Sequence, residues 1–200
     1  MVMMALSKSG NYKRLTRNDY FSNIALLVSQ RSTCLRRHVG AIIVNDDEIL
    51  STGYNGAPTG LPHCLDKGCQ IDNGHCIRSV HAEQNAIIQL IKTDANHYNN
   101  LELYVTDYPC KICAKMIVQA NIKKIYFVRR YSNSVNDEYT NNLFKEAGIK
   151  VINYYPKNYM FLGNISDVKL NKINQILNEK DENLIKESKL DNQINNSEKE

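Results

Sequence analysis

Three metal-binding side chains and one carboxylate stand at spacings that suit zinc chemistry. His81 and Glu83 belong to a His-x-Glu segment, and Cys110 and Cys113 follow in a Pro-Cys-x-x-Cys segment. Zinc readily binds one imidazole and two thiolates, and three protein ligands leave a fourth position for water. Zinc lowers the pKa of such a water to about 7, so hydroxide is available at neutral pH. The residue types therefore predict a zinc site formed by His81, Cys110 and Cys113.

We predict that Glu83 transfers protons at this site rather than binding the metal. A closed structural zinc site needs four ligands and has no use for a carboxylate two residues from its histidine. The order His-x-Glu, then Pro-Cys-x-x-Cys, is typical of zinc nucleobase deaminases. In that chemistry Glu83 would take a proton from the zinc-bound water, deliver it to the pyrimidine ring nitrogen, and help to protonate the leaving amine.

Both ligand groups are expected at the starts of helices. Apolar periodicity predicts helices over residues 81–92 and 110–120, and Pro109 helps to set the start of the second. Two cysteines at i and i+3 share one helix face, so both sulfurs can reach one ion. The positive end of each helix dipole would stabilise the thiolates and the bound hydroxide.

The elements that must position these helices indicate an α/β fold. A helix is expected over residues 18–31, and β-branched runs on both sides of Asn45-Asp46-Asp47 predict a hairpin. Strands alternate with helices after residue 80, which implies a partly parallel sheet with helices packed on it. These later elements are expected as strands at 101–106, 124–129 and 149–154 and a helix at 138–147. Residues 55–80 show little periodicity and are expected to form a long loop that something holds in place.

Composition limits the class of protein. The chain has 200 residues, 42% of them apolar, which suits one domain with its own core, and its net charge of +4 is too small to indicate a protein that wraps nucleic acid. No apolar run approaches the roughly 20 residues that span a bilayer, and the start does not resemble a secretory signal. We therefore expect a soluble cytoplasmic protein that binds neither nucleic acid nor membrane. We expect a deaminase domain at 1–164 and a polar tail at 165–200, where a helix frays into disorder.

A second metal site is predicted near the long loop, formed by four further cysteines: Cys34, Cys64, Cys69 and Cys76. Disulfides rarely persist in reducing cytosol, so metal binding is the better explanation for so many cysteines. Four sulfurs, or three sulfurs with His75 as the substitute ligand, would form a closed structural zinc site that pins the loop. Free cysteines in a reduced cytosol are the alternative.

Further blocks of sequence resemble the deoxycytidylate deaminase family, which includes the competence-operon deaminase-like proteins of bacteria. The likeness runs from about Asn18 to Tyr155. Besides the zinc motifs it rests on Arg31-Ser32-Thr33-Cys34, Val39-Gly40-Ala41, Gly53-Tyr54-Asn55-Gly56, Gly74-His75-Cys76-Ile77-Arg78 and Tyr104-Val105-Thr106. The resemblance implies a three-layer α/β/α cytidine-deaminase-like fold with a five-stranded mixed sheet. It also implies hydrolysis of dCMP to dUMP and ammonia for thymidylate synthesis, a hexamer, activation by dCTP and inhibition by dTTP.

The same resemblance suggests contacts to the substrate. Asn55, in a glycine-flanked turn, is expected to meet a sugar hydroxyl, and Arg36 is expected to bind the phosphate. Tyr131 could stack on the base or cap the pocket, while Tyr108 and Asp107 are expected to line the approach to Cys110. An ordinary structural role is the alternative for each of these residues.

Two other functions stay open at this point. The tRNA adenosine deaminases share both zinc motifs, but they have a shorter stretch between the asparagine and the histidine and should present a basic face. A non-catalytic zinc scaffold with a docking tail is the alternative outside enzymes, although such a protein has no need of Glu83.

Overall fold

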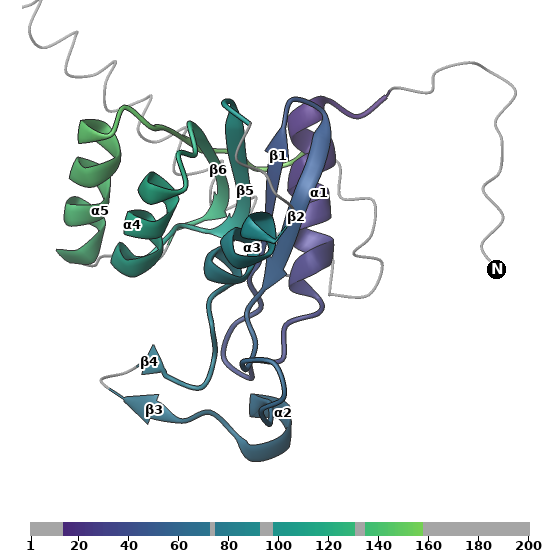
Figure 1. Ribbon diagram of the computed structural model, residues 1–200. Helices are drawn as coiled ribbons and strands as arrows, with labels where there is room; N and C mark the ends of the chain where they lie inside the picture. Colours follow the sequence, from purple (N-terminus) through teal and green to yellow (C-terminus); the bar gives the residue numbers. More distant parts are fainter. Residues whose placement is uncertain (1–13, 73–74, 93–97, 131–134, 158–200) are drawn as a thin grey trace, which may run out of the picture. The chain divides into compact units, whose positions relative to one another are not determined.

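The computed structural model describes residues 14–72, 75–92, 98–130 and 135–157. The helices are α1 (Arg17–Ser29), α2 (Cys64–Lys67), α3 (Ala82–Ile91), α4 (Lys111–Gln119) and α5 (Val135–Glu146). The strands are β1 (Gly40–Asn45), β2 (Glu48–Tyr54), β3 (Ile71–Asp72), β4 (His75–Cys76), β5 (Leu101–Asp107), β6 (Lys124–Arg129) and β7 (Lys150–Asn153), as labelled in Figure 1.

Five strands form one mixed sheet in the order β2-β1-β5-β6-β7. Strand β1 pairs antiparallel with β2 and β5, whereas β5 with β6, and β6 with β7, are parallel pairs. Each parallel pair needs a crossover connection, which α4 and α5 supply in turn. The carboxyl ends of β5 and β6 therefore lie at the same edge of the sheet, where open α/β sheets bind their ligands.

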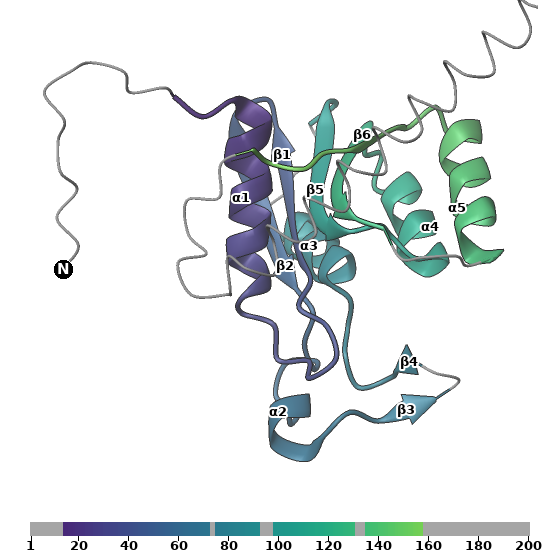
Figure 2. The ribbon, with the colours of Figure 1, turned by 180° about the vertical axis from the view of Figure 1, so that it is seen from behind.

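Alternate side chains of the central strands pack on opposite faces of the sheet. One face meets α1, and its buried cluster is Phe21, Ala25, Ile42, Val44, Tyr104 and Tyr126. The other face, which carries Ile43, Leu103 and Ile125, packs against α3, α4 and α5. Figures 1 and 2 show α1 on one side of the sheet and α3 on the other. This arrangement confirms the predicted three-layer α/β/α fold with its five-stranded mixed sheet.

Gly53 sets the distance between β2 and α3. A Cβ at this position would overlap the backbone of Ala82 and Ala86 in α3, so a glycine is required for this close approach. Between these two alanines in α3, the Asn85 side chain donates a hydrogen bond of 2.8 Å to the carbonyl of Tyr54. Together these contacts hold helix α3, which follows His81 and carries Glu83, against the sheet.

Asp19 joins the first helix to the end of the last strand. Its carboxylate accepts hydrogen bonds from the Thr16 hydroxyl at 2.8 Å, the Tyr154 hydroxyl at 2.9 Å and the backbone N–H of Lys157 at 3.0 Å. Burial alone would raise the pKa of Asp19, but these hydrogen bonds hold it below the ordinary value. The contact therefore binds segments that lie 138 residues apart in the sequence.

Most predicted elements lie within a few residues of those observed, with two differences. Helix α5 begins at Val135, three residues before the predicted start. The 55–80 segment contains the one-turn helix α2 and the short hairpin β3–β4, both too brief to leave a periodic signal. The boundary predicted at residue 164 and the tail at 165–200 lie outside the described residues and stay predictions. Within the described ranges, no helix is both long and apolar enough to cross a membrane.

Candidate active site

His81, Cys110 and Cys113 converge where α3 and α4 begin. The Nδ1 atom of His81 lies 3.5 Å from the Cys110 sulfur and 3.4 Å from the Cys113 sulfur. A tetrahedral zinc, with Zn–S about 2.3 Å and Zn–N about 2.0 Å, separates nitrogen from sulfur by about 3.5 Å. The three ligand atoms therefore already have the spacing of a zinc site, as the sequence predicts.

Local sequence explains why the ligands sit at helix starts. His81 is the N-cap of α3, and its backbone N–H donates to the Gln84 side chain at 2.9 Å, as in a capping box. Cys110 is the N-cap of α4, and Cys113 lies in the first turn of that helix. The positive ends of both helix dipoles therefore point at this cluster and favour thiolates.

The two cysteines are unequal in the absence of metal. A hydrogen bond from Cys113 lowers the pKa of Cys110 to about 3, against the effect of burial, and His81 lowers it further. Donation of that hydrogen bond and burial both raise the pKa of Cys113. The metal-free pair therefore keeps one proton, which zinc binding would release.

Glu83 is almost completely buried in the first turn of α3, with 4% of its surface exposed. Burial raises its pKa to about 7, although the charge of His81 opposes the shift. Among the described residues, the metal-binding group holds His81 and the two cysteines without Glu83. A carboxyl near half-protonation at neutral pH, beside the ligands but outside their set, suits proton transfer.

The other four cysteines also come together. Cys34, Cys64 and Cys69 place their sulfurs within 4.8 Å of one another. The Cys76 sulfur lies 3.6 Å from that of Cys64 and is also hydrogen-bonded to Cys69. Three of these sulfurs, those of Cys34, Cys64 and Cys69, therefore have the mutual spacing of ligands to one zinc, in which neighbouring sulfurs lie about 3.8 Å apart. Cys76 adjoins them beside Cys64 but lies outside that group of three, so the closed four-cysteine site stays a prediction. The side chain of the alternative ligand His75 lies outside the described part of the structure.

This cysteine cluster connects two loops. Cys34 lies in the connection between α1 and β1, whereas the other three belong to the 55–80 segment. A contact of 3.1 Å between the Thr33 hydroxyl and His63 Nδ1 joins the same two segments. The cluster therefore supports the predicted role of holding the long loop.

Asn55 braces the chain just before β1. Its side-chain carbonyl accepts from the Val39 N–H and its amide donates to the Arg37 carbonyl, both at 2.8 Å. The Ser32 hydroxyl reaches the Asn55 carbonyl at 3.0 Å and the Arg37 carbonyl at 3.2 Å. The asparagine thus has a structural role, and its predicted contact to a sugar hydroxyl stays a prediction.

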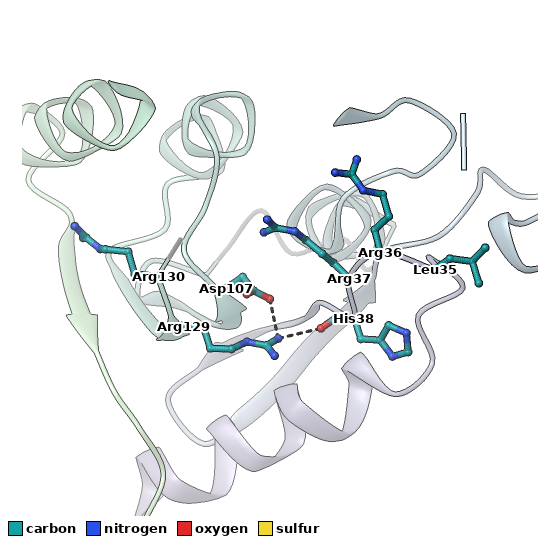
Figure 3. A pocket seen from close by; sticks show the side chains of 7 residues that line it. All are labelled: Leu35, Arg36, Arg37, His38, Asp107, Arg129 and Arg130. Carbon is teal, nitrogen blue, oxygen red and sulfur yellow. Dashed lines mark hydrogen bonds and ion pairs between the residues drawn. The ribbon is translucent and has the colours of Figure 1, made fainter. Parts of the chain in front are cut away.

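A basic pocket of about 490 Å³ opens at the carboxyl ends of β5 and β6 (Figure 3). It is lined by Leu35, Arg36, Arg37, His38, Asp107, Arg129 and Arg130, so it contains the predicted phosphate ligand Arg36. Asp107 connects the pocket to the zinc ligands, because it precedes Cys110 by three residues and its charge contributes to the raised pKa of Glu83.

Comparison with known proteins agrees with this geometry. The family profile of the cytidine and deoxycytidylate deaminase zinc-binding region matches residues 15–129. The chain belongs to this family. It is 42% identical over 139 residues to ComE operon protein 2 of Bacillus subtilis, covering 70% of this chain and 71% of that protein. It is 31% identical over 150 residues to a deoxycytidylate deaminase of Schizosaccharomyces pombe, covering 70% of this chain but only 44% of the yeast protein.

A solved structure supports the same conclusion. The crystal structure of dCMP deaminase from the cyanophage S-TIM5, in complex with dCMP and dUMP, matches with a TM-score of 0.58 and 34% identity. The match covers 68% of this chain and 95% of the phage chain. The family and the cytidine-deaminase-like fold predicted from sequence are confirmed, and with them the class of enzyme, a deaminase.

The two tyrosines predicted near the substrate have different outcomes. Tyr108 is 4% exposed, and its ring packs against Phe127 with centroids 4.9 Å apart. Its hydroxyl donates to Asn141 at 2.5 Å, and the Arg130 guanidinium lies 4.3 Å above its ring. Tyr108 thus has a packing role, and its substrate contact stays a prediction. Tyr131 lies outside the described residues.

Several pocket residues were missed by the sequence analysis. Arg37, His38, Arg129 and Arg130 were not assigned a role, because they come from two segments that are about 90 residues apart. The available signal is a pair of consecutive arginines, Arg129 and Arg130, at the carboxyl end of a predicted strand, the sheet edge where ligands bind.

Proposed function

We propose that the chain catalyses the hydrolytic deamination of dCMP to dUMP and ammonia, with zinc held by His81, Cys110 and Cys113. The observation that carries this proposal is a ligand set with zinc spacing beside a buried Glu83. It is supported by relatives that are named deoxycytidylate deaminases and by the phage enzyme's complex with dCMP and dUMP.

Glu83 moves both protons of the reaction. Zinc, when bound, supplies an acidified water and a positive charge that stabilises the transition state. Glu83 accepts one proton from the attacking water and delivers it to ring nitrogen N3, while the water oxygen bonds to C4. Glu83 then takes the second proton from the new C4 hydroxyl and transfers it to the exocyclic amine, and the C4–N bond breaks to release ammonia as C4 becomes a carbonyl.

The remaining site residues bind the nucleotide. Arg36 contacts the phosphate, which suits a guanidinium in a basic pocket, and Asn55 contacts the sugar. Tyr131 stacks on the base or caps the pocket, and Tyr108 and Asp107 line the approach to Cys110. The phosphate assignment is supported by the place of Arg36 in the lining of the basic pocket, which Asp107, three residues before Cys110, also lines.

We further propose that Cys34, Cys64, Cys69 and Cys76 hold a second, structural zinc. The mutual spacing of the Cys34, Cys64 and Cys69 sulfurs supports this, together with the contact of 3.6 Å between the sulfurs of Cys64 and Cys76. From the family resemblance we also propose a hexamer in the cytoplasm that is activated by dCTP, inhibited by dTTP and supplies dUMP for thymidylate synthesis.

In the decisive experiment, zinc-replete protein is incubated separately with each candidate substrate: dCMP, CMP, deoxycytidine, dCTP and a tRNA-like adenosine stem-loop. Ammonia release and base absorbance are followed, and dCMP is tested with and without dCTP and dTTP. We expect rapid conversion of dCMP, increased by dCTP. Inosine in the stem-loop without conversion of any cytosine nucleotide would reject the proposed substrate and favour tRNA editing.

A further inference from the structure

Asp107 is oriented by the sheet before any ligand arrives. It ends β5, and its Oδ2 accepts a hydrogen bond of 2.9 Å from the hydroxyl of the fully buried Thr106. That hydroxyl in turn accepts from the backbone N–H of Gly40 in β1 at 3.2 Å. The pairing of β1 with β5 therefore fixes the direction of this carboxylate, whose side chain is only 13% exposed.

Arg129, which ends β6, is held by the same carboxylate. Its Nη2 donates to Asp107 at 2.9 Å and to the carbonyl of His38 at 3.1 Å (Figure 3). Both contacts use one nitrogen, and a guanidinium carries further donors on Nη1 and Nε. The Arg129 side chain is 53% exposed, so its head is accessible from solvent while its plane is fixed.

The positive charge of the pocket explains why Arg129 needs a carboxylate to hold it there. Arg36, Arg37, Arg129 and Arg130 line one pocket, and like charges in one pocket repel one another. Asp107 also faces Arg37, whose pKa is lowered by burial and raised by the charge of this carboxylate. Half of the Arg129 side chain is exposed, and an ion pair with so exposed a partner contributes little to stability, so stability alone is a weak reason for this pair.

We propose that Arg129 is a specificity-determining residue that binds the 5′-phosphate of the nucleotide, and that Asp107 is a positioning residue that acts through Arg129. The inference rests on the proposed function, because it concerns the same site. A fork held in place before binding loses less side-chain entropy when it contacts a phosphate. Because a nucleoside offers nothing to this fork, Arg129 should matter only for phosphorylated ligands.

The test compares Arg129→Gln, Asp107→Asn and the double variant with wild type, using dCMP and deoxycytidine as substrates. For Arg129→Gln we expect kcat/KM for dCMP to fall about 10- to 100-fold, mostly through KM, as for loss of a hydrogen bond to a charged group. The value for deoxycytidine should stay within about threefold. Arg14→Gln, which changes an exposed arginine outside the pocket, is the matched control.

The double variant tests whether Asp107 acts through Arg129. If it does, Asp107→Asn weakens dCMP use, and adding it to Arg129→Gln changes kcat/KM for dCMP by less than about threefold. A higher kcat/KM for dCMP in Asp107→Asn than in wild type would overturn the positioning role, because it would mean that the carboxylate merely repels the phosphate. An equal loss with dCMP and deoxycytidine in Arg129→Gln would overturn the specificity role.

Calorimetric binding of dUMP and deoxyuridine separates this inference from the proposed function. If wild type deaminates no cytosine nucleotide but Arg129→Gln weakens dUMP binding selectively, the phosphate site stands and the proposed reaction fails. If wild type deaminates dCMP and Arg129→Gln binds dUMP as wild type does, the reaction stands and the inference fails. Thermal unfolding and zinc content of each variant show whether it is folded.

Discussion

The proposed role of the buried Glu83 carboxyl group in proton transfer can be tested directly by substitution. Glu83→Gln keeps the shape of the side chain but removes the proton acceptor. Turnover of dCMP should fall by about 10²- to 10⁴-fold, the usual contribution of general acid–base catalysis. Zinc content should not change, because Glu83 is not among the ligands. Steady-state kinetics and elemental analysis measure both, with the exposed Glu146→Gln as the control. A variant that keeps more than about a tenth of the wild-type rate would refute the role.

The raised pKa of Glu83 also affects stability in the metal-free protein. Its pKa is about 7 when folded, against 4.5 for the ordinary carboxyl. Between these values the unfolded chain loses the proton that the folded chain keeps, so stability decreases as pH rises. Relative to Glu83→Gln, the metal-free wild type should lose about 3 kcal/mol of unfolding free energy between pH 4.5 and pH 7. Urea unfolding of both proteins in chelator measures the difference. Parallel pH profiles would show that Glu83 is not held neutral by burial.

At the scale of elements, the contact between β2 and α3 decides where the catalytic groups lie. Gly53→Ala places a methyl group against the backbone of Ala82 and Ala86 and must push α3 away from the sheet. We expect a loss of about 1–3 kcal/mol in stability, typical of overpacking, together with weaker zinc binding. Thermal unfolding and zinc titration measure these effects. Ser51→Ala, on the same strand, removes a buried hydroxyl without a hydrogen-bond partner among the described residues and should not weaken zinc binding.

The cysteine cluster and the basic pocket share one segment, because Cys34 is followed closely by Arg36 and Arg37. Cys64→Ser should therefore lower the zinc content from about two ions to about one per chain and raise KM for dCMP more than it lowers kcat. Cys113→Ser also removes one zinc, but it should abolish kcat. Elemental analysis with steady-state kinetics distinguishes the two variants. An unchanged zinc content in Cys64→Ser would mean that these cysteines bind no metal.

The catalytic residues that the sequence predicted belong to two short motifs, and the occurrence of both motifs in this order is itself typical of zinc nucleobase deaminases. His81 with Glu83, and Cys110 with Cys113, lie within single helix starts, so helical periodicity is enough to bring each pair together. The pocket formed by Asp107 and Arg129 depends instead on the parallel pairing of β5 with β6. Sequence spacing carries no information about which strand ends become neighbours, and the order of the sheet emerges only from tertiary packing.

For the whole molecule, the described residues already contain both cysteine clusters and the pocket. A chain that ends at residue 164, the predicted domain boundary, should therefore keep its zinc content and its kcat/KM for dCMP. Kinetics and elemental analysis of the shortened chain, beside the full chain, test this. A large loss of activity would show that residues 165–200 contribute to the deaminase, contrary to the predicted division of the chain.

The hydrogen bonds around Asp19 have a consequence for how the chain could be connected. They bring the start of α1 and the segment after β7 into contact, so the first and last described elements are spatial neighbours. Proteins whose termini lie close together often tolerate circular permutation. A permuted protein, in which a short linker joins these two ends and the chain begins elsewhere, should keep the contacts of the zinc site. The helices and strands could thus follow one another in a different order along the chain while the zinc ligands and Glu83 keep their positions.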